Sequence, residues 1–162
     1  PLIAAITGTA VAGGREISLA CGMIVASNET VFGLPEVKRS LVAAAGGLFR
    51  LPRALGMATA MELITTGDPL PAQRAYELGM VNKVVDKSDV LDEAKALASR
   101  IMANAPLAVQ ASRNVASRAM IDDDSDLWRA GNKAFQGIVG TEDYKEGPLA
   151  FIEKRPPNWK GK

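Results

Sequence analysis

The chain has no histidine among its 162 residues and only one cysteine, Cys21. Without histidine, a Ser-His-Asp triad, a Cys-His pair and any histidine-ligated metal are excluded within this chain. A single cysteine excludes an internal disulfide, and we therefore expect a cytoplasmic protein. Any chemistry must use carboxylates, hydroxyl groups, lysine or backbone amides.

The sequence also has no large excess of positive or negative residues and no long apolar run. Lysine and arginine number 19 against 18 aspartates and glutamates, a net charge of +1, which argues against a nucleic-acid partner. No run reaches the roughly 18 apolar residues that span a membrane, and no charged leader opens the sequence. Aromatic residues make up 5% and hydrophobic residues 48%, a composition typical of a globular protein.

The apolar pattern predicts a strand-rich first half and a helical second half. Pro1 leads directly into an apolar run typical of a buried strand, so we expect that an N-terminal portion is absent. The strands are expected over 2–6, 23–27, 30–33 and 81–85. Helices are expected from about Gly14 and over 48–55, 57–65, 71–78, 90–104, 107–120, 127–138 and 141–153, the last interrupted at Pro148.

A glycine-rich turn, ITGTAVAGGREI, joins the first strand to the first helix. Small residues at Ala12, Gly13 and Gly14 let the backbone approach a ligand, and amides at a helix N-terminus stabilise an anion. Such turns also serve packing alone. The turn also matches a relaxed dinucleotide-binding fingerprint, with Glu29 at a suitable distance downstream.

Two carboxylates stand near predicted turns. Glu16 occupies the first turn of the helix opened by the glycines, where it can simply complement the helix dipole. Glu36 follows Pro35 in FGLPEV and can cap the next turn. Taken separately, each glutamate fits these structural roles better than catalysis.

Several motifs in order change this interpretation. The segments ITGTAVAGGREISLACG, VFGLPEVK, AAAGGLFRLPRALG, MELITTGDPLPAQRAYELGMVNKVV and EGPLAFIEKR cover nearly the whole chain. Together they resemble the enoyl-CoA hydratase/isomerase (crotonase) family. The resemblance implies an α/β, crotonase-like fold. It places the C-terminal part of a ββα spiral core, with active-site loops, at residues 1–86 and a helical, CoA-covering trimerisation region at 87–162.

The resemblance also implies site residues. Gly13, with Gly14 beside it, corresponds to the family's oxyanion-hole glycine, and Glu16 and Glu36 to its two catalytic glutamates. Members that keep both glutamates usually add water to a 2-enoyl-CoA, with Glu36 supplying the proton and Glu16 activating the water. The chemistry fits, because paired carboxyl groups can share a proton and amides can stabilise the enolate. Neither a metal nor a cofactor is expected, since the CoA thioester is the substrate.

Partners follow from the same resemblance. Family members form trimers, often paired into hexamers, in which residues at the positions of Phe151 and Lys154 contact a neighbouring subunit's CoA. The absent segment would supply the second oxyanion amide and most of the adenine pocket, so the isolated chain is expected to be inactive. Ala12, Arg15 and LVAAA (41–45) depart from the family pattern. Arg15 either reaches an acidic partner or alters the acyl pocket.

Three alternatives stay open at this point. Within the family, the chain can be an isomerase or a dehydratase of another acyl-CoA. Outside the family, GTAVAG can belong to a fragment of a dinucleotide-binding oxidoreductase. The third alternative is an assembly module that has kept its glycines for packing.

Overall fold

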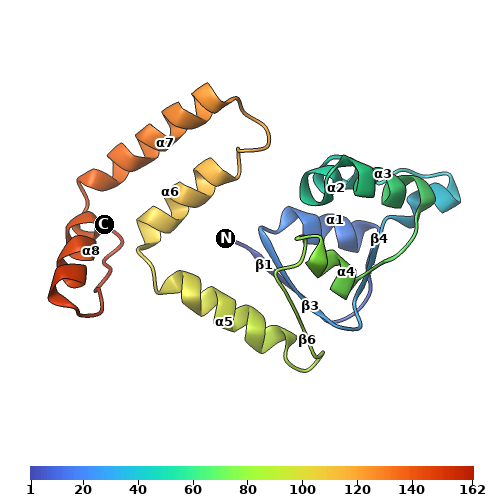
Figure 1. Cartoon of the computed structure of the whole chain (residues 1–162), viewed down its shortest axis with the longest axis horizontal. Coiled ribbons are helices and arrows are strands. Elements are labelled where there is room, and N and C mark those ends of the chain that lie inside the picture. Colours follow the sequence, from blue (N-terminus) through green and yellow to red (C-terminus); the bar gives the residue numbers. More distant parts are fainter. The chain divides into compact units, whose positions relative to one another are not determined.

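The computed structural model describes residues 1–162 as two compact units, Pro1–Leu97 and Ala98–Lys162 (Figure 1). The N-terminal unit contains β1 (Ile3–Ile6), β2 (Ala10–Val11), α1 (Gly13–Ala20), β3 (Met23–Ser27), β4 (Val31–Gly33), the 3-10 helix η1 (Pro35–Arg39), α2 (Gly47–Leu55), α3 (Met57–Thr66), β5 (Leu70–Pro71), α4 (Ala72–Glu77), β6 (Lys83–Val85) and the first part of α5 (Val90–Met102). The C-terminal unit contains the end of α5, then α6 (Pro106–Ala116), α7 (Asp124–Val139) and α8 (Glu142–Glu153). The units therefore divide within α5, whereas the family resemblance divides the chain at residue 86.

Two small sheets organise the N-terminal unit. One is the parallel sheet β1-β3-β6, and the other has the order β2-β4-β5, with β5 antiparallel to β4. The central strand β3 is buried on both faces. Its alternate residues Ile24 and Ala26 enter the main core, while Val25 packs with Val90 and Ala94 of α5 on the other side.

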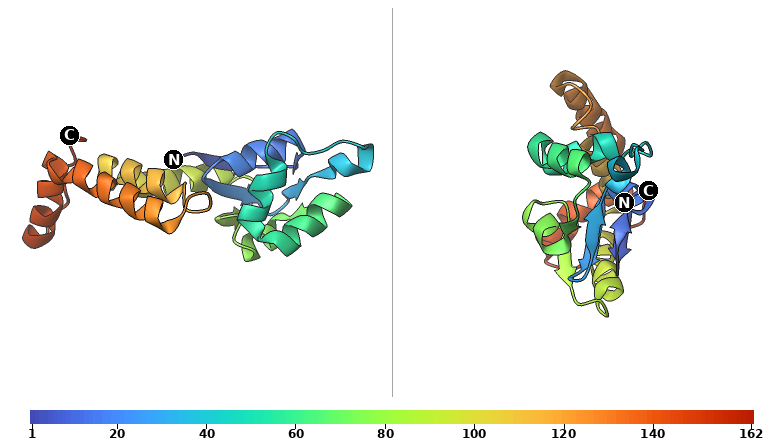
Figure 2. Two further views of the ribbon diagram at one scale, coloured as in Figure 1. Left: turned by 90° about the horizontal axis from the view of Figure 1, so that it is seen from above. Right: turned by 90° about the vertical axis from the view of Figure 1, so that its right-hand side faces the viewer.

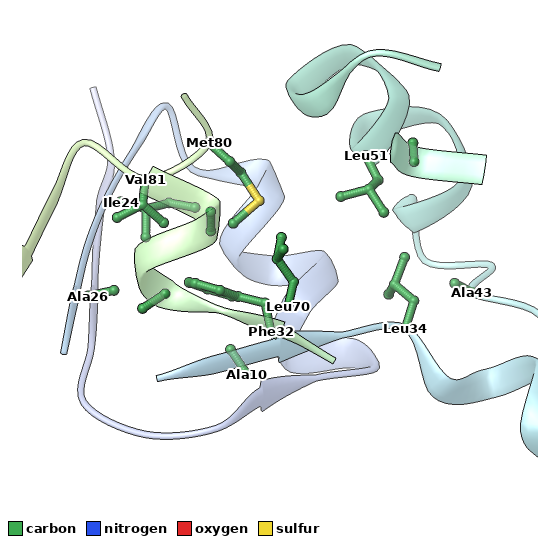
Figure 3. Packing of buried hydrophobic residues seen from close by; sticks show 13 residues of the cluster. Ala10, Ile24, Ala26, Phe32, Leu34, Ala43, Leu51, Leu70, Met80 and Val81 are labelled. Carbon is green, nitrogen blue, oxygen red and sulfur yellow. The ribbon is translucent and has the colours of Figure 1, made fainter. Parts of the chain in front are cut away.

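The main core lies between the sheets and helices α2 to α4 (Figure 3). Phe32 of β4 lies beside Leu70 of β5, and both are almost completely buried. Leu34, which follows β4, points toward Leu51 of α2, and Ala43 lies near them. This apolar contact fixes α2 next to the end of β4, where the candidate catalytic residues lie.

The C-terminal unit is helical. Figures 1 and 2 show α6 and α7 as an antiparallel pair. The next helix, α8, contacts α7 through the rings of Phe135 and Tyr144, which pack edge to face with 6.1 Å between their centroids. After α8 the chain turns back along the same helix, where Arg155 binds Glu146. No helix of the chain is both long and apolar enough to cross a membrane.

The structure confirms the predicted strand at 23–27 and places the other predicted strands within their expected ranges. Sequence reasoning missed β2 and β5, because two-residue strands at sheet edges leave no periodic signal. It also placed the start of α7 at 127, whereas the helix begins at Asp124, where acidic residues in the first turn complement the helix dipole. The expected interruption of α8 is wrong. The helix continues through Pro148, which forgoes a single backbone hydrogen bond.

The ion pair at α8 predicts an acid-sensitive contact. Hydrogen bonds from the Arg155 guanidinium and the Asn158 N–H lower the pKa of Glu146 from 4.5 to about 2. Because the folded-state pKa is the lower one, this stabilisation is complete above about pH 4.5 and is lost as the pH falls toward 2. We expect Trp159 fluorescence, read in a Trp128→Phe background, to change over this range. A Glu146→Gln variant should lack this acid transition, and an identical transition in that variant would exclude Glu146 as its cause.

Candidate active site

The first helix begins at an unusual backbone conformation. Ala12, between β2 and α1, has φ 49° and ψ −127°, a combination that L residues rarely adopt. Its N–H donates to the Gly33 carbonyl of β4 at 3.1 Å, and its carbonyl accepts from the Glu16 N–H at 3.0 Å. The turn therefore ends the β2 pairing and starts the helix within one residue.

Glu16 is buried, with an exposed fraction of 5%. Its Oε1 accepts a hydrogen bond of 3.0 Å from the backbone N–H of Gly47, the first residue of α2. The N-terminal end of α2 therefore faces the carboxylate. A side chain at Gly47 would not fit: an added Cβ would lie 3.2 Å from this Oε1 and 3.0 Å from both Leu34 Cδ1 and Ala43 Cβ.

Glu36 lies in the first turn of η1, two residues beyond Leu34. Its side chain is half-buried, and Oε2 is a buried atom without a hydrogen-bond partner. An ion pair of 3.0 Å between Lys38 and Asp68 fastens η1 to the loop after α3. Gly47 thus lies between the Glu16 carboxylate and the strand end that leads to Glu36, so both glutamates belong to one region of the unit.

Gly13 and Gly14 form the exposed start of α1. An added Cβ at either residue would meet nothing within 4 Å, so neither glycine is required by packing inside this chain. Their N–H groups belong to the first helical turn, which has no intrahelical acceptors. A hollow of about 540 Å³ lies beside Gly14, lined by residues 4–10 and by Ile17, Ser18 and Cys21. These α1 residues share one stripe of the helix, whereas Glu16 points inward from another.

Arg15 is the least expected feature of the region. Only 1% of the residue is exposed, and its guanidinium stacks on Phe32, with 4.8 Å between Cζ and the ring centroid. Nε and Nη1 are buried without acceptors in this chain. Burial alone lowers the pKa of Arg15 to about 10, so the side chain stays charged at neutral pH. The acidic partner considered from the sequence is absent within the chain, and the stacking on Phe32 holds the guanidinium instead.

The remaining site candidates lie in the C-terminal unit. Phe151 of α8 is 85% exposed, and Lys154 caps that helix in a left-handed conformation with φ 53°.

Sequence reasoning missed Gly47 as the partner of Glu16. The GG pair after AAA indicated a turn, but nothing in it pointed to a buried carboxylate 31 residues earlier. No group of three or more cysteine, aspartate or glutamate side chains is arranged to hold a metal ion.

Comparison with known proteins identifies the family. The enoyl-CoA hydratase/isomerase family profile matches residues 1–162, which is the whole chain. The chain belongs to the enoyl-CoA hydratase/isomerase family. Membership overturns the dinucleotide-binding interpretation of GTAVAG, because this glycine turn is part of the crotonase fold and not of a Rossmann unit.

Individual relatives agree with this assignment. The crystal structure of an enoyl-CoA hydratase from Mycobacterium marinum superposes with a TM-score of 0.97 at 48% identity, covering 100% of this chain and 66% of that one. The crystal structure of an enoyl-CoA hydratase from Mycobacterium tuberculosis superposes with a TM-score of 0.96 at 47% identity, covering 100% of this chain and 64% of that one. Carnitinyl-CoA dehydratase of Proteus mirabilis is 42% identical over 100% of this chain and 64% of its own length. The chain thus spans about two-thirds of the length of these relatives.

The space around Gly47 leads to a prediction about stability. Gly47→Ala should lower the free energy of unfolding by roughly 1–3 kcal/mol, because the added methyl group overpacks the contact with Leu34 and the Glu16 carboxylate. Gly131→Ala is the matched control, since an added Cβ there, within α7, meets nothing within 4 Å. Urea unfolding of both variants checks this. A Gly47→Ala variant as stable as the unsubstituted chain would show that α2 can shift to make room for the methyl group.

Arg15 leads to a second prediction. Arg15→Met should raise the free energy of unfolding by about 1–4 kcal/mol, because it removes a buried charge without acceptors and keeps an apolar chain on Phe32. Arg15→Lys, which keeps a charge but loses the planar stacking, should be less stable than the native chain. Thermal unfolding measures both. A destabilised Arg15→Met variant would mean that an acceptor from outside this chain pairs with the guanidinium.

Proposed function

We propose that the full-length protein hydrates a 2-enoyl-CoA thioester, with Glu16 and Glu36 as its acid–base pair. The main support is the Gly47 N–H bond to Glu16, which holds this carboxylate beside the segment that leads to Glu36. A general base must be held in a fixed position, and the backbone donor at the start of α2 does this for the Glu16 carboxylate.

In the proposed reaction the oxygen of water bonds to the β-carbon while a proton is delivered to the α-carbon. Glu16 orients and activates the water, and Glu36 supplies the proton. The electron pair of the double bond moves toward the thioester carbonyl, where negative charge develops on oxygen. The Gly13 amide, with Gly14 beside it at the start of α1, stabilises that oxygen. The open space at both glycines is consistent with a ligand bound there.

A full site requires more than this chain. Because the chain spans only 64–66% of the matched relatives, we assign the second oxyanion amide and the adenine pocket to a segment outside it. The chain is then the C-terminal part of the enzyme, inactive when isolated. Residues 1–86 complete the spiral core and residues 87–162 form the oligomerisation and CoA-covering region. We further propose a cytoplasmic trimer or hexamer, in which Phe151 and Lys154 contact the CoA of a neighbouring subunit.

Dehydration is the second candidate reaction. Curated relatives from Proteus mirabilis and Escherichia coli at 42% and 39% identity are carnitinyl-CoA dehydratases. The same two glutamates would then act in reverse: the Glu36 carboxylate removes the α-proton, and Glu16 in its protonated form donates a proton to the β-hydroxyl, which leaves as water as the C–O bond breaks. Isomerisation within the family would need only one of them for proton transfer, so the presence of both favours hydration or dehydration.

The glutamates provide the direct test. In the full-length protein, Glu16→Gln and Glu36→Gln should each lower kcat for crotonyl-CoA by about 10²–10⁴-fold, because each removes one proton-transfer group. Loss of the conjugated-thioester absorbance measures the rate. Glu62→Gln, an exposed position on α3, is the matched control and should keep full activity.

The outcomes separate the candidates. A folded, CoA-binding protein that leaves crotonyl-CoA unchanged but dehydrates a 3-hydroxyacyl-CoA carrying a larger acyl group would replace hydration with dehydration. If the carbon–carbon double bond moves along the acyl chain and no oxygen from solvent water enters the product, the reaction is isomerisation. Absence of CoA binding and of turnover would support the assembly-module interpretation.

A further inference from the structure

The chain beyond α8 runs back along that helix from its end to its beginning. We call residues 155–162 the strap. Its contacts follow in order: Arg155 and Asn158 bind Glu146, and Trp159 packs at Gly147, where an added Cβ would lie 3.4 Å from the indole ring. The Lys162 carbonyl then accepts a hydrogen bond of 2.7 Å from the Glu142 N–H at the first turn of α8.

Asp143 is the buried anchor of the strap, with 4% of the residue exposed. Its Oδ1 accepts the Lys160 N–H at 2.6 Å, and Oδ2 accepts the Gly161 N–H at 2.9 Å. Two charge-assisted bonds to consecutive backbone amides fix the strap backbone itself, independently of its side chains. Asp143 is therefore satisfied by the strap alone and would be left unpaired if the strap were released.

Glu146 and Trp159 provide the other two anchors. The Arg155 guanidinium binds Glu146 through two bonds, of 2.6 and 2.9 Å, and the Asn158 N–H adds a third of 2.7 Å. Trp159 Nε1–H donates to the Ala103 carbonyl, just beyond α5, at 2.8 Å. The indole group thus ties the strap to a second helix end as well as to α8.

The packing of α8 shows why the strap is needed. Within its unit, the helix buries only Asp143 and Ala150. Phe151 is 85% exposed and Ile152 is 74% exposed, so the last turn of α8 has little apolar contact to hold it. A helix with so small a buried face gains little orientation from its own packing. The strap is bonded along the length of α8, and its Trp159 ties the pair to the Ala103 carbonyl just beyond α5.

We propose that Asp143 and Trp159 are positioning residues, which act through the strap to hold Phe151 and Lys154 in place for the nucleotide half of a CoA thioester. The inference rests on the proposed function, in which these two side chains contact CoA. Lys154 directly precedes the strap, and the Arg155 N–H bonds to the Ala150 carbonyl at 3.1 Å. The lysine is thus joined directly to the first residue of the strap.

The test uses the full-length protein and two variants. Asp143→Asn keeps the shape but replaces one acceptor oxygen with a donor, and Trp159→Phe removes the indole N–H together with part of the packed ring. Each should weaken CoA binding, measured by calorimetry, by about tenfold, the effect of losing one charge-assisted or buried hydrogen bond. KM for crotonyl-CoA should rise by a similar factor with kcat unchanged. For the crotonyl thioester of N-acetylcysteamine, which lacks the nucleotide, kcat/KM should stay within about twofold of the wild-type value. Trp128→Phe, at an exposed position on α7, is the matched control and should bind CoA normally.

Three results would overturn the proposal. One is unchanged CoA affinity in both variants although Trp159 fluorescence in Asp143→Asn, or proteolysis in either variant, shows a released strap. The second is an equal loss for the CoA and the short thioester, which indicates general destabilisation. The third is a wild-type protein that does not bind CoA. A wild type that binds CoA but turns over neither thioester would refute the proposed function alone, because the binding comparison still decides the role of the strap.

Discussion

The hydrogen bond from the Gly47 amide to Glu16 is the interaction on which the arrangement of the N-terminal unit depends. It places the start of α2 against a carboxylate of α1, and it leaves no room for a side chain at Gly47. Leu34 lies near the same position, where a Cβ at Gly47 would come within 3.0 Å of its Cδ1. A buried charge and a buried leucine thus fix the same helix end, so the chemistry and the packing of this unit cannot be changed independently.

Much of this could be predicted from sequence because it is local. The strand over 23–27, the start of α1 at the glycines and the position of Glu16 in its first turn all follow from apolar period and turn residues. The order of motifs then indicated the family, which the comparisons confirm. The roles of Glu16 and Glu36 come from that resemblance and stay predictions, since each glutamate alone fits a structural role.

The features that sequence reasoning missed are contacts between distant residues. The Gly47 amide and Glu16 are 31 residues apart, and a backbone donor carries no side-chain signature. The stacking of Arg15 on Phe32 had no pattern to reveal it, because a guanidinium in an apolar core breaks the usual distribution of charge. Asp143 in TEDYKEG looks like an ordinary first-turn acid, and its binding to residues 160 and 161 depends on a chain reversal that local propensities do not encode.

The central position of β3 has a consequence for biosynthesis. Val25 pairs with Lys83, so one edge of β3 stays without its neighbour until β6 has left the ribosome. During that interval a strand of five mostly apolar residues presents free backbone groups, the kind of edge on which chains associate wrongly. The β1–β3 pair can form early, whereas closing the sheet waits for the whole α2–α4 segment. Nascent chains of this protein are therefore most exposed to aggregation between the synthesis of β3 and that of β6.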